Sequence, residues 1–224
     1  MGVFLGCAPR WALRLYSDEY GEPLFYIDTD RLVVALTIDD GPDPITTPAI
    51  LDVLARYRAR ATFFLISGNT PGNGALIRRL LAEGHEIGNH MPRDEPSIDL
   101  PPDRFCVELT KAHQALSAFG PVRWFRPGGG RSTAAMRSAA RQLGYRTALG
   151  EVYPFDPHIP SVTWIRLHIA AVVRPGSIVV LHDRGARGWR TAEALDHLLP
   201  ALAARGYRVV TLSALVAEGD AAGE

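Results

Sequence analysis

Side chains that can do hydrolytic chemistry stand at the ends of apolar segments of this sequence. Asp39 and Asp40 close one apolar run, and His182 closes another. His90 and Asp94 are four residues apart, a spacing at which two metal ligands share one face of a helical turn. A carboxylate can take a proton from water, a histidine can deliver one, and a metal ion can polarise a carbonyl. Metal-assisted hydrolysis is the chemistry that these residue types favour.

The elements that must position these side chains alternate between strand and helix patterns. Near-continuous apolar strands that alternate with helices are typical of a parallel sheet covered by helices. About seven such units favour an α/β fold of the distorted (β/α) barrel type, with an open sheet as the alternative, and in either fold the chemistry lies at the carboxyl edge. The expected strands are 31–39, 61–66, 85–90, 123–127, 145–150, 177–183 and 207–213, and the expected helices are 46–59, 73–84, 102–120, 132–144, 162–173 and 191–206.

Other polar residues at the same predicted edge are open to two interpretations. Arg126 precedes the glycine run 128–130, which can bring backbone N–H groups near a reacting carbonyl or can be a flexible loop. Asp183 follows His182 at the end of an apolar strand and joins the candidate set. His85 lies inside a predicted strand and is interpreted as a structural histidine.

Composition excludes several classes of protein. The 224 residues contain 24 acidic and 24 basic side chains, which gives no support for a nucleic-acid partner or a polybasic membrane surface. No apolar run is long enough for an integral membrane segment, and no signal peptide is evident at the start. Cys7 and Cys106 do not form a disulfide framework. We expect one domain at 31–216, an extension packed on it at 1–30, and a tail at 217–224.

Four motifs in a fixed order resemble the polysaccharide deacetylase family, also called the NodB-homology or carbohydrate esterase family 4 domain. They read "TIDDGPDP", "HEIGNHMPRD", "FRPGGG" and "IVVLHD", and "ATFFLISGN" is similar to the second strand of that family. The likeness spans about residues 31 to 212. It implies a distorted (β/α) barrel of NodB-homology type, removal of N- or O-acetyl groups from glycans, and one divalent metal ion as cofactor.

The resemblance also implies catalytic roles. Asp39 would be the general base that deprotonates water, and Arg126 would orient it and keep it ionised. His182 would protonate the leaving amine or alkoxide. Asp156 is the candidate partner of that histidine, although an aspartate before Pro157 can equally cap a turn.

The implied metal ligands are Asp40, His90 and Asp94. The family usually has a second histidine where this chain has Asp94. Zinc is the first expectation, and the second carboxylate keeps manganese, cobalt and magnesium open. In the alternative, Asp94 turns outward and the protein is a non-catalytic, glycan-binding relative.

The implied substrate contacts come from three residues. Gly128 and Gly129 would border the groove, with a backbone N–H near Gly129 stabilising the oxyanion, and Leu181 would line the pocket for the acetyl methyl group. Where the family usually has a bulky aromatic residue, this chain has Gly129, so we expect a more open groove.

The expected function is metal-dependent deacetylation of a glycan such as a chitooligosaccharide or peptidoglycan. Hydrolysis of a small non-glycan amide on the same fold is the second enzymatic alternative. We expect the acetylated glycan as the partner, a monomer, and no nucleic-acid or integral-membrane partner. The family is usually found in the cell envelope or secreted, and the sequence leaves the location of this chain undecided.

Overall fold

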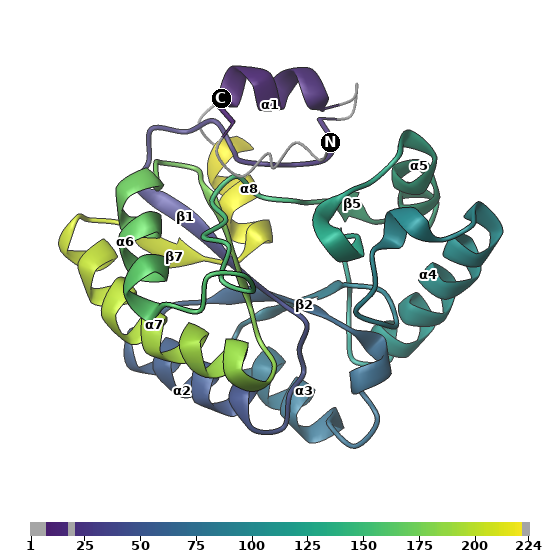
Figure 1. The fold of residues 1–224 in the computed structure, drawn as a ribbon, viewed down its shortest axis with the longest axis horizontal. Coiled ribbons are helices and arrows are strands. Elements are labelled where there is room, and N and C mark those ends of the chain that lie inside the picture. The colour runs from purple at the N-terminus through teal and green to yellow at the C-terminus, as the bar shows by residue number, and fades with distance from the viewer. Residues whose placement is uncertain (1–7, 18–20, 221–224) are drawn as a thin grey trace.

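A curled parallel sheet forms the centre of the molecule (Figure 1). The computed structural model describes residues 8–17 and 21–220. Within those residues seven strands form one sheet in the order β5-β4-β3-β2-β1-β6, with β7 also paired to β1, and every strand pair is parallel. The strands are β1 (Val33–Asp39), β2 (Ala61–Leu65), β3 (Glu86–Asn89), β4 (Trp124–Phe125), β5 (Arg146–Thr147), β6 (Ile178–His182) and β7 (Arg208–Val210). The predicted distorted α/β barrel is confirmed.

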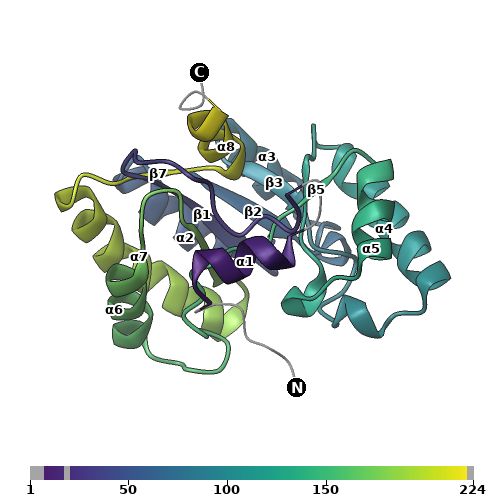
Figure 2. The same cartoon turned by 90° about the horizontal axis from the view of Figure 1, so that it is seen from above.

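Helices cover the outside of this sheet. Seen from above, α4 and α5 lie on one side of it, and α6 and α7 lie on the other (Figure 2). The described helices are α1 (Arg10–Tyr16), α2 (Thr46–Arg56), α3 (Gly74–Ala82), α4 (Pro102–Ser117), α5 (Ala134–Gln142), α6 (Val162–Val172), α7 (Gly185–Ala204) and α8 (Leu212–Asp220). No helix of the described residues is both long enough and apolar enough to cross a bilayer.

The central strand β1 places two candidate catalytic residues at one level. Its seven residues are all buried, which explains the unbroken apolar run in the sequence. In the register of the parallel ladder, Asp39 is the partner of His182 on β6 and of Phe64 on β2. Because paired residues of neighbouring strands point to the same side of a sheet, Asp39 and His182 face the same space.

Isolated β-bridges connect the chain between the two ends of the strand order, β5 and β6. Val152 bridges Val179 in parallel, and Leu24 bridges Ala148. Helix α1 packs against this region, because Leu13 shares a small apolar cluster with Phe25, Tyr26 and Leu149. The described part of the predicted extension therefore contacts the barrel. Residues 1–7 and 18–20 of that extension lie outside the described residues.

Several predicted segments differ from the observed ones. Helix α7 begins at Gly185, six positions before the predicted start at 191, because Asp183 and Asp43 accept backbone N–H groups at its first turn. Strand β7 ends at Val210, and α8 follows, so the predicted tail at 217–224 begins inside a helix. Strand β5 has two residues where 145–150 was predicted, because Leu149 and Gly150 turn their N–H groups to Leu24 instead.

Gly88 leaves room for the Phe64 ring beneath the Arg126 side chain. A Cβ on Gly88 would lie 2.6 Å from Phe64 Cδ1, and the Arg126 guanidinium carbon lies 4.1 Å from the centre of that ring. We expect Gly88→Ala to lower the free energy of unfolding by about 1–3 kcal/mol through overpacking. Denaturant titration measures this. Gly74→Ala, whose added Cβ would meet its neighbours only at 3.5 Å, is the control near zero. An unchanged midpoint for Gly88→Ala would contradict the prediction.

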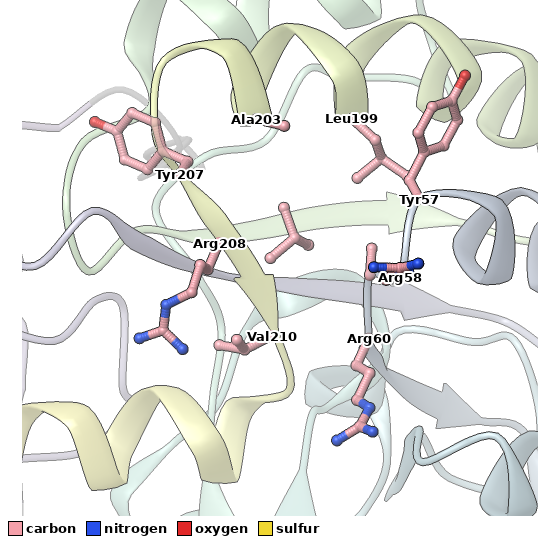
Figure 3. Close-up of a pocket in the computed structure, with 10 residues that line it drawn as sticks. Tyr57, Arg58, Arg60, Leu199, Ala203, Tyr207, Arg208 and Val210 are labelled. Atoms are coloured by element: carbon pink, nitrogen blue, oxygen red, sulfur yellow. The ribbon is translucent and has the colours of Figure 1, made fainter.

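A hollow of about 320 Å³ opens at the opposite edge of the sheet (Figure 3). Tyr57, Arg58 and Arg60 border it just before β2 begins, and Tyr207 and Arg208 border it at the start of β7. These are the amino ends of the strands. The carboxyl edge, where the candidate catalytic residues lie, is at the other end of the same strands.

Candidate active site

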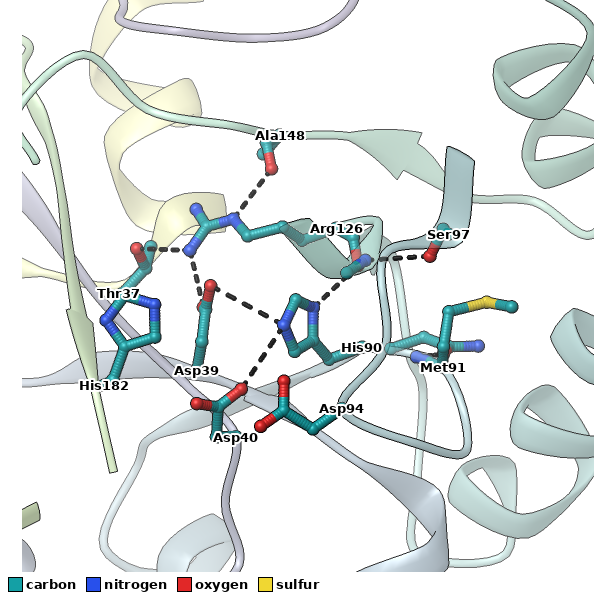
Figure 4. A network of polar contacts seen from close by, with 12 residues as sticks. Thr37, Asp39, Asp40, His90, Met91, Asp94, Ser97, Arg126, Ala148 and His182 are labelled. Carbon is teal, nitrogen blue, oxygen red and sulfur yellow. Dashed lines mark hydrogen bonds and ion pairs between the residues drawn. The ribbon is translucent and has the colours of Figure 1, made fainter. Parts of the chain in front are cut away.

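The ends of four strands bring the predicted polar residues together (Figure 4). Asp39 ends β1, His90 follows β3, Arg126 follows β4, and His182 ends β6. Asp40 follows Asp39 directly. All five residues have little or no exposed surface. A cluster of ionisable groups that the fold removes from water is costly unless the groups pair with one another.

Asp39 is held by a fully buried guanidinium. Arg126 donates from Nη1 to Asp39 Oδ1 at 2.6 Å and to Thr37 Oγ1 at 2.9 Å, and from Nε to the Ala148 carbonyl at 2.9 Å. Burial lowers the pKa of Arg126, and the charge of Asp39 opposes that change. The buried ion pair therefore fixes the orientation of the Asp39 carboxylate, as a base that accepts a proton requires.

Four of the five described non-glycine residues with left-handed backbone lie around this site. Asp40 has φ 75°, Met91 66°, Phe155 58° and Arg184 81°, and each of them lies at or close to a candidate site residue. Such conformations cost free energy, and they persist where the surrounding structure over-determines them, which is often at a functional site. The turn at Asp40 also explains how two successive acids serve one site, because it redirects the chain immediately after β1.

The His90 ring is oriented by a backbone carbonyl. Its Nδ1 lies 2.8 Å from the Arg126 carbonyl oxygen, so Nδ1 carries the proton and donates it. Its Nε2 faces two carboxylates, at 3.6 Å from Asp40 Oδ1 and 3.9 Å from Asp39 Oδ2. In the neutral ring this Nε2 holds a lone pair. A lone pair that faces carboxylate oxygens is an arrangement that a cation between them would stabilise.

Asp40 and His90 fit a divalent cation, and Asp94 is engaged elsewhere. Asp40 Oδ2 is buried and accepts no well-oriented hydrogen bond from any described residue, and its one charged neighbour among them is Arg187 Nη1 at 2.9 Å. The pKa of Asp40 is raised, mainly by burial. A bound cation would favour the ionised form of this carboxyl group. The Asp94 side chain is 48% exposed, and its Oδ2 lies 3.4 Å from Arg187 Nη2. Among the described residues, no three Asp, Glu, His or Cys side chains gather as a ready metal site. The predicted role of Asp94 as a ligand stays a prediction.

His182 is held by Asp156, the partner that the sequence offered. Asp156 is buried and lies between β5 and α6. Its Oδ1 is 3.0 Å from His182 Nδ1, and its Oδ2 accepts the His182 backbone N–H at 3.1 Å. Burial alone lowers the pKa of His182, but the charges of Asp156, Asp39 and Asp40 outweigh it, and the pKa is raised. The imidazole is therefore suited to carry the proton that a leaving group needs.

We expect Asp156→Asn to shift the alkaline limb of activity to lower pH. The Asp156 carboxylate stabilises the protonated ring of His182, so its removal lowers the pKa of His182. A group that must be protonated then loses its proton earlier as the pH rises. The pH profile of kcat/KM measures the shift, and an NMR titration of the His182 ring measures it without turnover. An alkaline limb that stays in place or moves upward would contradict this role of Asp156.

The predicted substrate contacts receive less support from the geometry. The glycine run packs closely on the preceding loop, because a Cβ on Gly128 would lie 2.2 Å from the Glu95 carbonyl oxygen. Gly129 has φ 72°, which also favours glycine. These constraints explain both residues without a ligand, so their contact with substrate stays a prediction. Leu181 is completely buried in the main core and exposes no surface, so the predicted pocket for the acetyl methyl group has no support here.

Two further candidates have structural roles. Asp183 is fully buried and accepts the hydroxyl groups of Thr46 and Thr47, which ties the start of α2 to the end of β6. His85 Nδ1 accepts the Ala61 backbone N–H at 3.1 Å, and burial lowers the pKa of His85 to about 4. His85 is therefore a neutral structural histidine, in agreement with its interpretation from the sequence.

Comparison with known proteins assigns the family. The family model described as polysaccharide deacetylase matches residues 27–148. A peptidoglycan-N-acetylglucosamine deacetylase of Bacillus cereus is 35% identical over 208 residues, covering 91% of this chain and 97% of that protein. The chain belongs to the polysaccharide deacetylase family. A chitooligosaccharide deacetylase of a Bradyrhizobium species is also 35% identical, over 81% of this chain and 90% of that relative.

A solved member of the polysaccharide deacetylase family has the same fold. Peptidoglycan deacetylase PdaC from Bacillus subtilis superimposes with a TM-score of 0.80 at 28% sequence identity. The match covers 88% of this chain and 96% of that structure. The NodB-homology barrel predicted from the motifs is therefore shared over most of both chains.

Arg187 is a residue of the candidate site that the sequence did not indicate. Its Nη1 lies 2.9 Å from Asp40 Oδ2, and its side chain is 29% exposed. The helix predicted from the sequence begins at 191, so Arg187 lies outside the predicted elements. A signal was present nonetheless, because an arginine soon after the motif "IVVLHD" lies within reach of the carboxyl edge of β6.

Proposed function

We propose that the protein is a metal-dependent hydrolase that removes N-acetyl groups from a glycan such as a chitooligosaccharide or peptidoglycan. The observation that carries the proposal is the pairing of Asp39 with His182 on adjacent strands. Each of the two has its own charged partner, since Arg126 holds Asp39 and Asp156 holds His182. One group is thereby kept ready to accept a proton and the other to give one.

These residues supply both proton transfers of amide hydrolysis. Asp39 takes a proton from water as the water oxygen bonds to the acetyl carbonyl carbon. His182 then gives its proton to the amide nitrogen as the carbon–nitrogen bond breaks. The products are acetate and a free amine on the sugar. Without a proton the amine anion would be a very poor leaving group, so a site without His182 would be slow on amides.

Asp40 and His90 would hold a divalent cation beside this pair, with Asp94 as the predicted third ligand. When bound, the cation would act as a Lewis acid toward the acetyl carbonyl. The fixed Nδ1–H tautomer of His90 supports this assignment, because histidine ligands commonly donate their other ring N–H to a carbonyl. Zinc, manganese, cobalt and magnesium are the ions to test.

The names of the relatives support a glycan substrate. Curated relatives that match most of this chain are named for deacetylation of peptidoglycan N-acetylglucosamine and of chitooligosaccharides. A protein that only bound glycan would have no need of a base, its orienting cation and an acid with its own carboxylate partner. The arrangement around Asp39 and His182 therefore favours turnover over binding alone.

Acetate release tests the proposal. The purified chain, loaded with each divalent ion in turn, is incubated with chitopentaose, with peptidoglycan, and with an aryl acetamide as a small amide. We expect acetate and free amine in equal amounts from at least one glycan, and loss of activity after chelation. Cleavage of the aryl acetamide alone would contradict the glycan assignment, and activity that survives complete chelation would contradict metal dependence.

A further inference from the structure

A guanidinium group lies between two of the predicted metal ligands. Arg187 approaches Asp40 Oδ2 with Nη1 at 2.9 Å and Asp94 Oδ2 with Nη2 at 3.4 Å. The planar fork of arginine is suited to contact two carboxylates at once. Asp40 follows β1, Asp94 lies in the loop after β3, and Arg187 is in the first turn of α7. One side chain therefore connects three separate segments at the mouth of the site.

The charges of the site explain why a cation is found there. The Asp39 and Asp40 carboxylates lie 3.9 Å and 3.6 Å from His90 Nε2, and Asp94 shares the Arg187 guanidinium with Asp40. The Arg126 guanidinium is directed to Asp39. Arg126 therefore does not pair with Asp40 or Asp94. In this structure the positive group that pairs with both is Arg187.

The guanidinium and a divalent ion would need the same carboxylate oxygens. A metal ion held by Asp40, His90 and Asp94 would use oxygens that Arg187 now contacts, and two cations in contact with the same carboxylates repel each other. The Arg187 side chain is 29% exposed, and Asp94 is 48% exposed, so both can move toward solvent. Asp40 is 3% exposed and cannot follow them.

We infer that Arg187 is an internal cation that competes with the divalent ion for Asp40 and Asp94. In the metal-free protein it neutralises the two carboxylates and ties α7 to the loop after β3. When the ion binds, the guanidinium leaves Asp40, and Asp94 becomes free to turn toward the ion. Metal affinity is therefore set by Arg187 as well as by the ligands. This inference rests on the proposed function, because it concerns the metal ion of that same site.

Calorimetric metal titration of Arg187→Gln tests the competition directly. The chelator-treated wild type and variant are titrated with Co²⁺ and with Zn²⁺. We expect the variant to bind at least about tenfold more tightly, because a positive charge has been removed from beside the ligands. Arg184→Gln is the matched control, since it removes the same charge from the exposed residue immediately before α7. Its affinity should stay within about twofold of the wild type.

Two further variants separate the contribution of Asp94 from a general effect on folding. Asp94→Asn in the Arg187→Gln background should abolish most of the gain in affinity, because Asp94 can then no longer act as a charged ligand. Arg187→Met replaces Arg187→Gln if the latter does not give the wild-type circular dichroism spectrum.

Thermal unfolding is a second readout. Without metal the Arg187 variant should melt below the wild type, and saturating metal should raise its Tm by more.

The outcomes distinguish a failure of this inference from a failure of the proposed function. Equal or weaker metal binding by the Arg187 variant would overturn the competition, even if the wild type releases acetate from glycans. A gain that persists in full when Asp94 is replaced would overturn the part given to Asp94. If no variant binds any divalent ion and no sample releases acetate, both the inference and the proposed function fail.

Discussion

Asp39→Asn is expected to lower kcat for glycan deacetylation by a factor of about 100 to 10,000, the usual contribution of a positioned general base. Asparagine keeps the shape of the side chain, and its Oδ1 can still accept from Arg126 Nη1, which now lies 2.6 Å from Asp39 Oδ1. What is lost is the carboxylate that takes the proton from water. Steady-state kinetics on the preferred glycan measure the loss, and KM should change far less than kcat.

Stability must be measured beside this activity. Arg126 is buried with Asp39 as its charged partner, so the Asn variant leaves a buried charge without its counter-ion, at a cost of about 3–5 kcal/mol. Assays therefore run well below the lowered Tm. Thr37→Val is the matched control, because it removes another acceptor of the Arg126 guanidinium and no carboxylate. It should lose stability and keep kcat within a few-fold. Wild-type kcat in Asp39→Asn would contradict the assignment of the base.

His182→Gln is expected to show a loss that depends on the leaving group. An amine must be protonated as it departs, so deacetylation of an N-acetyl glycan should fall by a factor of about 100 to 10,000. A nitrophenolate leaves without a proton, so hydrolysis of 4-nitrophenyl acetate should fall far less. Initial rates on the two substrates, measured on one sample of variant, give the comparison. Equal losses on both substrates would contradict the role of His182 as the acid.

Much of the fold follows from local patterns in the sequence. The apolar run that ends at Asp39 is typical of a buried strand, and its burial in the structure is complete. Parallel strands bring their carboxyl ends to one edge, which is why residues as distant as Asp39, Arg126 and His182 could be predicted to meet. The partner of His182 followed less directly, because Asp156 before a proline could equally have been a turn cap.

The remainder depended on tertiary contacts that no local pattern records. Helix α7 begins early because Asp43, from the loop after β1, accepts the N–H of Gly185, its first residue. That early start carries Arg187 to Asp40 and gives Asp94 a partner other than a metal ion. Helix α8 is a similar case. Its first N–H, at Leu212, donates to Thr62 Oγ1 on β2 at 2.9 Å, a contact made across the fold.

The predicted substrate contact of Leu181 stays a prediction. Strand alternation places successive side chains on opposite faces of a sheet, so a neighbour of His182 need not face the site. Leu181 indeed belongs to the buried core together with Ile38, its register partner on β1. On β1 the same alternation places Ile38 and Asp39 on opposite faces of the sheet.

The most direct test of the account is hydrolysis of chitopentaose by the metal-loaded chain in water labelled with heavy oxygen. Mass spectrometry follows the sugar and the acetate together. We expect one labelled oxygen atom in each released acetate, none in the sugar, and one new amine for each acetate, with the signal lost in Asp39→Asn. An oligosaccharide that is bound by the protein but returned with every acetyl group in place would contradict it.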